Sequence, residues 1–314
     1  MTERTRRCSW VHDTLFINRR GDAYACCWSK PGVVGNINDE TLEQIYYGER
    51  IQKFRQEEID GTLACAKTCK YLQHPLKDDL TPDYHNNLHY LLISFGHACN
   101  IACVMCGQDH KSRLELDSDT VIRNIELPKS LYSVSLYGGE PLVLKSARKY
   151  FDHCAAHGVK VSMVTNGTAI NKEMANKIAL HCSSITVSLN GASREIHERV
   201  NVGSRFDKVL KNVGLLVDAK KTLKGEVLII GHMTIVEQNV HEVAQFINKG
   251  RQFGFEGLNF SFDLKVPKFL AKDPALKKQI STEVKAALDG DQTAFQPDER
   301  PWVDTTHLHS LGFI

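Results

Sequence analysis

The stretch HYLLISFGHACNIACVMC, residues 89–106, joins a short apolar run to three closely spaced cysteines. The apolar part ends at a glycine, which is typical of a buried strand that runs into a loop. Cys99, Cys103 and Cys106 follow within eight positions of that loop. Parallel α/β sheets carry their chemistry at the carboxyl ends of the strands. The stretch therefore predicts a thiol-bearing site at the end of a first strand.

Five more apolar runs follow, and segments of helical period separate them. The runs are LYSVSLYGG (131–139), VKVSMVTNG (159–167), SSITVSLNG (183–191), EVLIIGHMTIV (226–236) and GLNFSFDL (257–264). Repeated strand and helix units with apolar strands indicate a parallel sheet covered by helices. The predicted fold class is α/β, a six-stranded parallel partial (β/α)6 barrel with a small N-terminal cysteine-rich module.

The chain divides by pattern into three parts. Residues 1–87 form the small module, in which TLFINRRGDAYACCW (14–28) predicts two short strands around a turn and DETLEQIYYGERIQKFRQEE (39–58) predicts a helix. Residues 88–265 form the barrel. Residues 266–314 predict one helix and an irregular tail.

Charge and cysteine content limit the classes of partner. The 39 basic and 37 acidic residues leave a net charge of +2, which gives no general attraction to nucleic acid or to an anionic membrane. The N-terminus lacks the apolar run of a signal peptide, so we expect a cytoplasmic protein without a membrane segment. Ten cysteines in a reducing compartment favour metal or redox chemistry over disulfides.

The cysteine triplet allows three interpretations. Spaced i, i+4, i+7, the thiols fit one buried face of a helix. They also fit a structural zinc site, to which His97, Asp109 or His110 adds the fourth ligand. The third interpretation is a cube of four irons and four sulfurs held by three thiolates, which leaves one iron open.

The C-x3-C-x2-C spacing after a first strand resembles the signature of the radical S-adenosylmethionine (SAM) enzymes. The resemblance implies a [4Fe-4S] cluster bound by Cys99, Cys103 and Cys106 and by SAM at the open iron. It also implies the activity: an electron from the cluster splits SAM into methionine and a 5′-deoxyadenosyl radical, which abstracts a hydrogen atom from the substrate.

The motif YGGEP (137–141) resembles the family's motif at the end of the second strand. The resemblance implies that backbone groups around Gly138 and Gly139 and the carboxylate of Glu140 meet the ammonium group of SAM. Glycines permit a close backbone approach, and an ammonium ion in a dry pocket requires an anionic acceptor. A plain glycine turn with a surface glutamate is the alternative.

Two further strand ends resemble family positions that hold the carboxylate and ribose of SAM. The implied residues are Thr165 and Asn166 in TNG and Ser188 and Asn190 in SLNG, each of which is equally a turn former. Arg199 is a candidate for the SAM carboxylate, with a solvated surface arginine as the alternative. Two positions depart from the family pattern: Met105 replaces an aromatic residue, and Asn190 replaces an aspartate.

A second group of cysteines lies in the N-terminal module. Its members are Cys8, Cys26, Cys27, Cys65 and Cys69. The module resembles the SPASM auxiliary-cluster domain or its shortened twitch version, which commonly follows the barrel instead of preceding it. The resemblance implies one auxiliary iron–sulfur cluster, a [4Fe-4S] cluster in our interpretation, and structural zinc is the alternative. Because neighbouring side chains on a strand point to opposite faces, only one of Cys26 and Cys27 is expected to ligate.

The resulting functional hypothesis is a radical SAM enzyme that modifies a peptide or small molecule, by oxidation if the auxiliary cluster accepts an electron from the substrate. Flavodoxin or ferredoxin is the implied electron donor, and no nucleic acid or membrane partner is expected. His232 and Asp263, near the ends of strands five and six, are candidate acid/base groups. The alternative is an iron–sulfur or zinc protein of the same fold with a structural or electron-transfer role.

Overall fold

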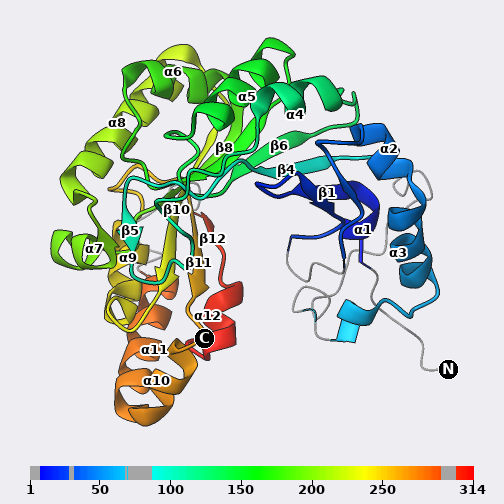
Figure 1. Ribbon diagram of the computed structural model, residues 1–314. Helices are drawn as coiled ribbons and strands as arrows, with labels where there is room; N and C mark the ends of the chain where they lie inside the picture. Colours follow the sequence, from blue (N-terminus) through cyan, green and yellow to red (C-terminus); the bar gives the residue numbers. More distant parts are fainter. Residues whose placement is uncertain (1–7, 28–31, 68, 70–86, 291–301) are drawn as a thin grey trace. The chain divides into compact units, whose positions relative to one another are not determined.

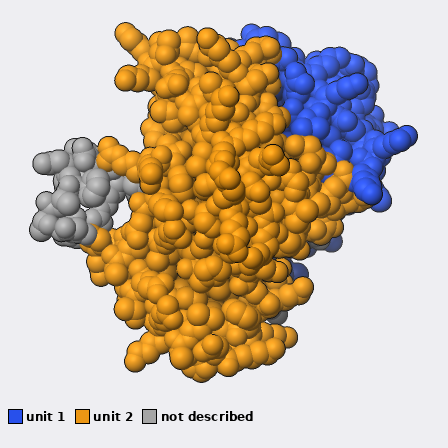
Figure 2. Space-filling model, turned by 90° about the vertical axis from the view of Figure 1, so that its left-hand side faces the viewer, with its two compact units in different colours: residues 1–98, 111–162 blue, residues 99–110, 163–314 orange. Residues whose placement is uncertain are grey.

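The structure is a computed structural model that describes residues 8–27, 32–67, 69, 87–290 and 302–314. The chain forms two compact units: unit 1 comprises residues 1–98 and 111–162, and unit 2 comprises residues 99–110 and 163–314. Figure 2 colours unit 1 blue and unit 2 orange. Among the described residues, no helix is long and apolar enough to cross a membrane. The boundaries at residues 87 and 265 remain a prediction of domain organisation.

Unit 1 contains the N-terminal module and the first two strands of the predicted barrel (Figure 1). Its strands are β1 (Thr14–Ile17), β2 (Asp22–Tyr24), β3 (Gly35–Asn36), β4 (Tyr90–Ser94) and β6 (Ser133–Tyr137). Its helices are α1 (Trp10–Asp13), α2 (Leu42–Tyr47), α3 (Glu49–Ile59), the 3₁₀ turn η1 (Ala64–Lys67), α4 (Ser118–Asn124) and α5 (Lys145–Ala156).

The module is joined to the barrel strands by backbone pairing. Within unit 1 the strand order is β6-β4-β1-β2-β3, with β4 parallel to both β6 and β1. The predicted hairpin is confirmed, because β1 and β2 pair antiparallel around Gly21, which has a φ of +85°. Glycine adopts this left-handed conformation without steric cost. The parallel pairing of β1 with β4 was not expected from the sequence.

One helix predicted in the module is two helices in the structure. The segment 39–58 forms α2 and α3, with the extended residue Gly48 between them at ψ 159°. A Cβ atom at Gly48 would lie 2.5 Å from the carbonyl oxygen of Gln44. Helical period continues across the break, which is why the pattern alone suggested one helix. The two helices therefore turn at Gly48, and this turn sets the direction of α3.

Unit 2 contains the remaining strands and helices. Its strands are β5 (Ala102–Cys103), β8 (Cys182–Ser188), β9 (Asn201–Val202), β10 (Leu228–Ile235), β11 (Gly257–Phe262) and β12 (Trp302–Val303). Its helices are α6 (Lys172–His181), α7 (Arg194–Val200), α8 (Phe206–Leu223), η4 (Val240–Glu242), α9 (Val243–Lys249), α10 (Val266–Lys272), α11 (Pro274–Asp289) and α12 (Thr306–Leu311). Strand β7 (Val161–Thr165) crosses the division between the units.

All six strands predicted for the barrel form: β4, β6, β7, β8, β10 and β11. In unit 2 the order is β12-β11-β10-β8-β7, and β8, β10, β11 and β12 pair in parallel. The α/β class with parallel strands is confirmed, and closure into a six-stranded partial barrel remains a prediction. The expectation of one helix and an irregular tail after residue 265 was wrong, because α10, α11, β12 and α12 form there.

The strands of unit 2 bury one face and leave the other half-buried. On β8, Ile185 and Val187 are fully buried, whereas Ser188 is half-buried. On β10, Met233 and Ile235 are fully buried, while His232 and Thr234 of the other face are half-buried. Alternation of this kind arises because successive strand side chains point to opposite faces. The half-buried face presents polar side chains, and the functional candidates of β8 and β10 lie there.

Candidate functional site

The three clustered cysteines lie on a loop in unit 2 and not on a helix. Strand β5 within this loop pairs antiparallel with β9, and Val104 N–H donates to the carbonyl oxygen of Val200 at 2.9 Å. A turn closes the loop, in which Cys106 N–H donates to the Cys103 carbonyl oxygen at 3.0 Å. Cys99 and Cys103 are half-buried and Cys106 is exposed. The interpretation as one buried helix face is therefore wrong.

An amide side chain lies beside the first cysteine. The Nδ2 group of Asn166 lies 3.6 Å from Cys99 Sγ and donates to Asn100 Oδ1 at 3.0 Å. Asn100 in turn donates to Thr168 Oγ1 at 2.8 Å. A donor aimed at a sulfur stabilises a thiolate, which is the form that binds iron. The predicted residue Asn166 thus lies beside a predicted cluster ligand.

A buried asparagine, Asn201, connects the second cysteine to the end of β8. Its Oδ1 lies 3.3 Å from Cys103 Sγ, and its Nδ2 donates to the Ser188 carbonyl oxygen at 3.0 Å. Asn190 donates to the same Oδ1 at 2.9 Å. Asn201 is fully buried, and no motif in the sequence pointed to it. Through this side chain, the strand end of SLNG and the cysteine loop hold each other in place.

Asn190, the residue that replaces the family aspartate, has a backbone role in this structure. Its φ is +54°, in the left-handed region that asparagine tolerates better than most residues. Its Oδ1 accepts the Thr234 N–H at 2.7 Å, and Asn239 donates to its carbonyl oxygen at 3.0 Å. Asn190 is 3% exposed, so its side chain fixes the ends of β8 and β10 to each other. Its predicted contact with ribose remains a prediction.

The TNG motif after β7 forms a turn that a helix supports from behind. Thr165 Oγ1 accepts the Gly167 N–H at 3.1 Å, and Asn166 Oδ1 accepts the Thr168 N–H at 2.9 Å. Asn212 of α8 donates to the Gly167 carbonyl oxygen at 2.8 Å. Asn166 therefore has both a turn-forming contact and a donor toward Cys99. Asn212 was missed by the sequence analysis because nothing in a helix pattern marks which polar residue faces inward.

Arg199 and Met105 occupy two different environments in unit 2. Arg199 is exposed on α7 and pairs with Glu195 at 2.6 Å, an i, i+4 ion pair of the kind typical of helix surfaces. Its predicted contact with the SAM carboxylate remains untested.

Met105 packs against Ile196, Val200 and Val236. Met105 also lines a small cavity of about 110 Å³ that Asp263 reaches from the end of β11.

The glycines of YGGEP lie against the chain that leads to Cys99. A Cβ atom at Gly139 would lie 2.0 Å from the Ala98 carbonyl oxygen, and one at Gly138 would lie 2.2 Å from that of Gly96. Gly139 N–H donates to Gly96 and Glu140 N–H donates to Ala98, both at 2.9 Å. Gly138 also has a φ of +98°. Both glycines are therefore required by the protein backbone itself, within unit 1.

Glu140 is buried, with 1% of its surface exposed. Its Oε1 accepts the Leu142 N–H at 3.1 Å, which holds the carboxylate over the turn. The alternative of a surface glutamate is therefore wrong. A buried carboxylate is costly unless a donor or a cation compensates its charge. Its role as the acceptor of an ammonium ligand remains a prediction.

Three thiols of the N-terminal module lie close enough to influence one another. Burial is the main cause that raises the pKa of the Cys8 thiol, to about 12, and the neighbouring thiols of Cys26 and Cys65 raise it further. The backbone N–H groups of Val11 and Trp10 donate to the Cys8 sulfur and act in the opposite direction. Thiols that share one site and receive backbone donors suit an iron–sulfur cluster.

The two adjacent cysteines have different surroundings, but the strand geometry expected for them is wrong, because β2 ends at Tyr24, before either of them. Cys26 is buried and lies near Cys8, whereas the half-buried Cys27 lies near Tyr137. Burial raises the pKa of Tyr137, and the Cys27 thiol raises it further. Cys26 is thus the better candidate of the pair. Cys69 is half-buried, and its role as a ligand remains a prediction.

Within the described ranges, no three His, Cys, Asp or Glu side chains converge closely enough to hold a single metal ion. A four-iron cube binds one thiolate at each iron, so its ligands are spread farther apart than those of one ion. The three thiols on one loop suit such a cube, and so do the three thiols of Cys8, Cys26 and Cys65. The residues present therefore fit iron–sulfur clusters at both positions.

His232 lies on the half-buried face of β10, opposite Asn259 of β11. Its Nδ1 faces Asn259 Oδ1 at 2.5 Å, and its Nε2 lies 3.1 Å from Thr234 Oγ1 and 3.0 Å from Ser261 Oγ. Nδ1–H therefore donates to the amide, and Nε2 is left to accept from a hydroxyl. Burial lowers the pKa of His232, so the ring is neutral at pH 7.

Asp263 has a local structural contact. Its Oδ1 accepts the Lys265 N–H at 2.8 Å just before α10, an Asx turn of a kind that aspartate commonly makes. It is half-buried at the small cavity beside Met105. An acid/base role for either His232 or Asp263 remains a prediction.

Comparisons with known proteins identify the family. A model described as the radical SAM superfamily matches residues 93–248, and a model described as the SPASM iron-sulfur cluster-binding domain matches residues 8–70. The chain belongs to the radical SAM superfamily and carries a SPASM domain on the N-terminal side of the radical SAM domain. SAM and iron–sulfur clusters are the cofactors that these two families imply.

Relatives with known sequences match part of the chain. Uncharacterized protein MJ0804 of Methanocaldococcus jannaschii is 27% identical over 56% of this chain and 61% of its own length. Mycofactocin maturase MftC of Mycolicibacterium smegmatis is 29% identical over 50% of this chain and 40% of its own length. The chain thus spans about half the length of these curated relatives. The solved structure of Streptococcus suis SuiB bound to precursor peptide SuiA has a TM-score of 0.48 and 16% identity, over 92% of this chain and 70% of SuiB.

Proposed function

We propose that this protein is a radical SAM enzyme that cleaves SAM reductively and abstracts a hydrogen atom from a peptide or small-molecule substrate. The observation that carries the proposal is the C-x3-C-x2-C loop, whose three thiols are presented on an irregular segment anchored by β5 and β9. When bound, a [4Fe-4S] cluster supplies the electron that splits the SAM sulfonium. The electron donor in the cell would be flavodoxin or ferredoxin.

The residues of the chain have distinct roles in this proposal. Cys99, Cys103 and Cys106 hold the cluster, and the buried carboxylate of Glu140 accepts the ammonium group of SAM. Asn166 supports Cys99 with its amide donor. The remaining proposed SAM contacts are Gly138, Gly139, Thr165, Ser188, Asn190 and Arg199.

The module contributes the auxiliary site in this proposal. Cys8, Cys26, Cys65 and Cys69 would hold one auxiliary cluster, and that cluster would supply an electron acceptor for an oxidative modification. Oxidation of a substrate radical also releases one proton, which requires a base. His232 is the proposed base, because its Nε2 is an acceptor on a half-buried polar face. A maturase among the relatives is consistent with a modifying activity of this kind.

Anaerobic turnover tests the proposal. The protein is loaded with iron and sulfide and reduced with dithionite. It should then convert SAM to 5′-deoxyadenosine, which liquid chromatography and mass spectrometry detect. The Cys99/Cys103/Cys106→Ala variant should lose roughly four irons per chain and all deoxyadenosine formation, because it lacks the ligands of the SAM-binding cluster. The auxiliary cluster should remain, because its ligand set is separate. Retention of both iron and deoxyadenosine by the variant would refute the assignment.

Deoxyadenosine formation also distinguishes the proposed enzyme from the alternative function. A structural or electron-transfer protein would bind iron, or zinc, and form no deoxyadenosine. The reaction partner is then sought by adding SAM and reductant to an anaerobic cell extract with the loaded protein. A peptide or metabolite that changes mass only with the wild-type chain, and not with the triple alanine variant, is the substrate.

A further inference from the structure

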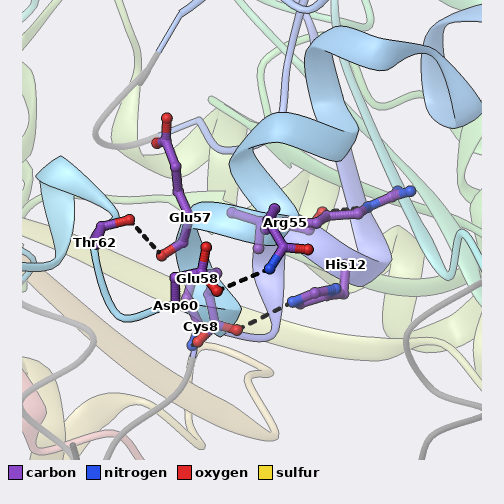
Figure 3. A network of polar contacts seen from close by, with 9 residues as sticks. Cys8, His12, Arg55, Glu57, Glu58, Asp60 and Thr62 are labelled. Atoms are coloured by element: carbon purple, nitrogen blue, oxygen red, sulfur yellow. Dashed lines mark hydrogen bonds and ion pairs between the residues drawn. The ribbon is translucent and has the colours of Figure 1, made fainter.

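A buried contact between a carboxylate and a histidine lies directly beside Cys8 in the N-terminal module. Glu58 of α3 accepts the Cys8 backbone N–H through Oε1 at 3.0 Å and contacts His12 Nε2 through Oε2 at 3.2 Å. Glu58 is 2% exposed and His12 is 3% exposed. Figure 3 shows Glu58 facing His12 and Cys8, whereas the side chain of Glu57 extends away from them. One carboxylate therefore joins α3 to both ends of the Cys8–His12 segment.

Helix α1, which follows Cys8, has only four residues. A helix this short is unstable alone, because the entropy lost in nucleating a helix exceeds the stabilisation from the hydrogen bonds of one turn. The backbone N–H groups of Trp10 and Val11 in this turn donate to the Cys8 sulfur. The direction of the thiol thus depends on contacts that hold α1 from outside.

Those contacts come from α2 and α3. Arg55 Nε donates to the Val11 carbonyl oxygen at 3.1 Å, and the Tyr46 hydroxyl donates to the His12 carbonyl oxygen. The Arg55 guanidinium stacks over the Tyr46 ring at 4.2 Å. Together with the contact of Glu58 to the Cys8 N–H, these side chains hold the backbone at Cys8, Val11 and His12. Arg55 and Glu58 are three positions apart on α3, which places them on one face of that helix.

The burial of Glu58 against His12 costs free energy of folding unless the contact has a specific role. Taking a carboxylate out of water is unfavourable, and an apolar side chain of similar size often stabilises a core equally well. The contacts made by Glu58 are directed at a proposed ligand and at the turn that orients it. We propose that Glu58, held by His12, is the positioning residue for Cys8 as the N-terminal ligand of the auxiliary cluster, an inference that rests on the proposed auxiliary site.

Iron retention in the auxiliary site tests this inference without turnover. The parent chain carries Cys99/Cys103/Cys106→Ala, so that bound iron reports the auxiliary site alone. Loaded anaerobically, it is mixed with the iron chelator bathophenanthroline, and release is followed by absorbance. Glu58→Ala should release iron about ten- to a hundredfold faster, because a charge-assisted hydrogen bond to the ligand backbone is lost. Glu58→Gln should show a smaller increase, since its amide oxygen still accepts the Cys8 N–H.

Glu57→Ala is the matched control. Glu57 is a carboxylate on the same helix, half-buried, and its side chain points away from Cys8. This variant should release iron at the parent rate. If Glu58→Ala does not yield soluble protein, the comparison of Glu58→Gln with Glu57→Gln decides the question, with faster release expected from Glu58→Gln and equal rates overturning the inference.

The same Glu58 substitution in a chain that also carries Cys8→Ser shows whether Glu58 positions Cys8 or supports the module in general. When Cys8→Ser is already present, Glu58→Ala should add no further acceleration of iron release. An equal acceleration in both backgrounds would overturn the inference, because Glu58 would then act independently of Cys8. Equal retention by Glu58→Ala and Glu57→Ala would also overturn it while leaving the auxiliary cluster intact. A parent chain that binds no iron would overturn the proposed auxiliary cluster and this inference together.

Discussion

Single residues in this protein are constrained by backbone atoms close to the cysteine loop. Gly138 and Gly139 have no room for a Cβ atom against Gly96 and Ala98, the residues that lead to Cys99. The hydrogen bonds from Gly139 and Glu140 to the same short segment fix the motif to it. The carboxylate of Glu140 is buried as a consequence. A binding group held this rigidly loses little entropy when its ligand arrives.

Replacing Glu140 by Gln tests the role of that carboxylate. The change keeps the shape of the side chain and removes the charge, so SAM should bind about ten- to a hundredfold more weakly while the cluster remains. Isothermal calorimetry of SAM on the anaerobic, cluster-loaded variant measures the affinity, and iron analysis confirms the cluster. Unchanged affinity would exclude contact between Glu140 and the SAM ammonium group.

At the scale of elements, the turn between α2 and α3 decides where the positioning residue Glu58 lies. Gly48 is extended between the two helices, and a Cβ atom there would meet the Gln44 carbonyl oxygen at 2.5 Å. The capping box of Thr41 and Gln44 begins α2 seven residues earlier. These local features fix the start of α3, and with it the face that carries Arg55 and Glu58.

The substitution Gly48→Ala should destabilise the protein by about 1–3 kcal/mol, because the added methyl group forces the backbone of α2 to shift. Gly214→Ala is the matched control. Gly214 is exposed in the interior of α8 with open space around it, so alanine should stabilise the helix by about 0.5–1 kcal/mol. Thermal unfolding followed by circular dichroism should therefore shift in opposite directions for the two variants. A shift in the same direction would contradict this account of Gly48.

At the scale of the whole molecule, the module and the radical SAM domain share a sheet. Strand β1 pairs in parallel with β4 from Thr14↔Tyr90 to Ile17↔Ile93. The side chains of Leu15, Ile17, Leu91 and Ile93 in this pair are fully buried. The module is therefore anchored by apolar burial as well as by its proposed cluster.

The Cys65/Cys69→Ala variant tests the role of the auxiliary cluster at this scale. If the cluster accepts an electron from the substrate radical, the variant should form deoxyadenosine from SAM at the wild-type rate. It should fail to produce the mass change that the wild-type chain produces in anaerobic extract. A cluster with only a structural role predicts loss of solubility instead, since small modules often depend on their metal. A soluble variant that forms the same product at the wild-type rate would exclude the redox role.

Much of the site could be predicted because its signals are local. Strand alternation and glycine-rich strand ends appear within short windows, and the cysteine spacing appears within eight residues. By contrast, the strand expected at Cys26 and Cys27 was wrong, because β2 ends at Tyr24, so the alternation of neighbouring strand side chains does not apply to them. The helix break at Gly48 was missed because the helical period runs through it. The strand and helix after residue 290 were missed because their pattern is too short to register.

The sequence by itself determined the family, the six strands and the two groups of thiols, since each is written in residues close together in the chain. Only the tertiary structure decided what surrounds those thiols. Asn201 reaches Cys103 across 98 positions, and Glu58 reaches the backbone of Cys8 across 50. No periodicity encodes such pairs, because they form only when distant segments pack and bury polar groups that must then find partners. For that physical reason, the thiols could be recognised from spacing, whereas the side chains that hold them could not.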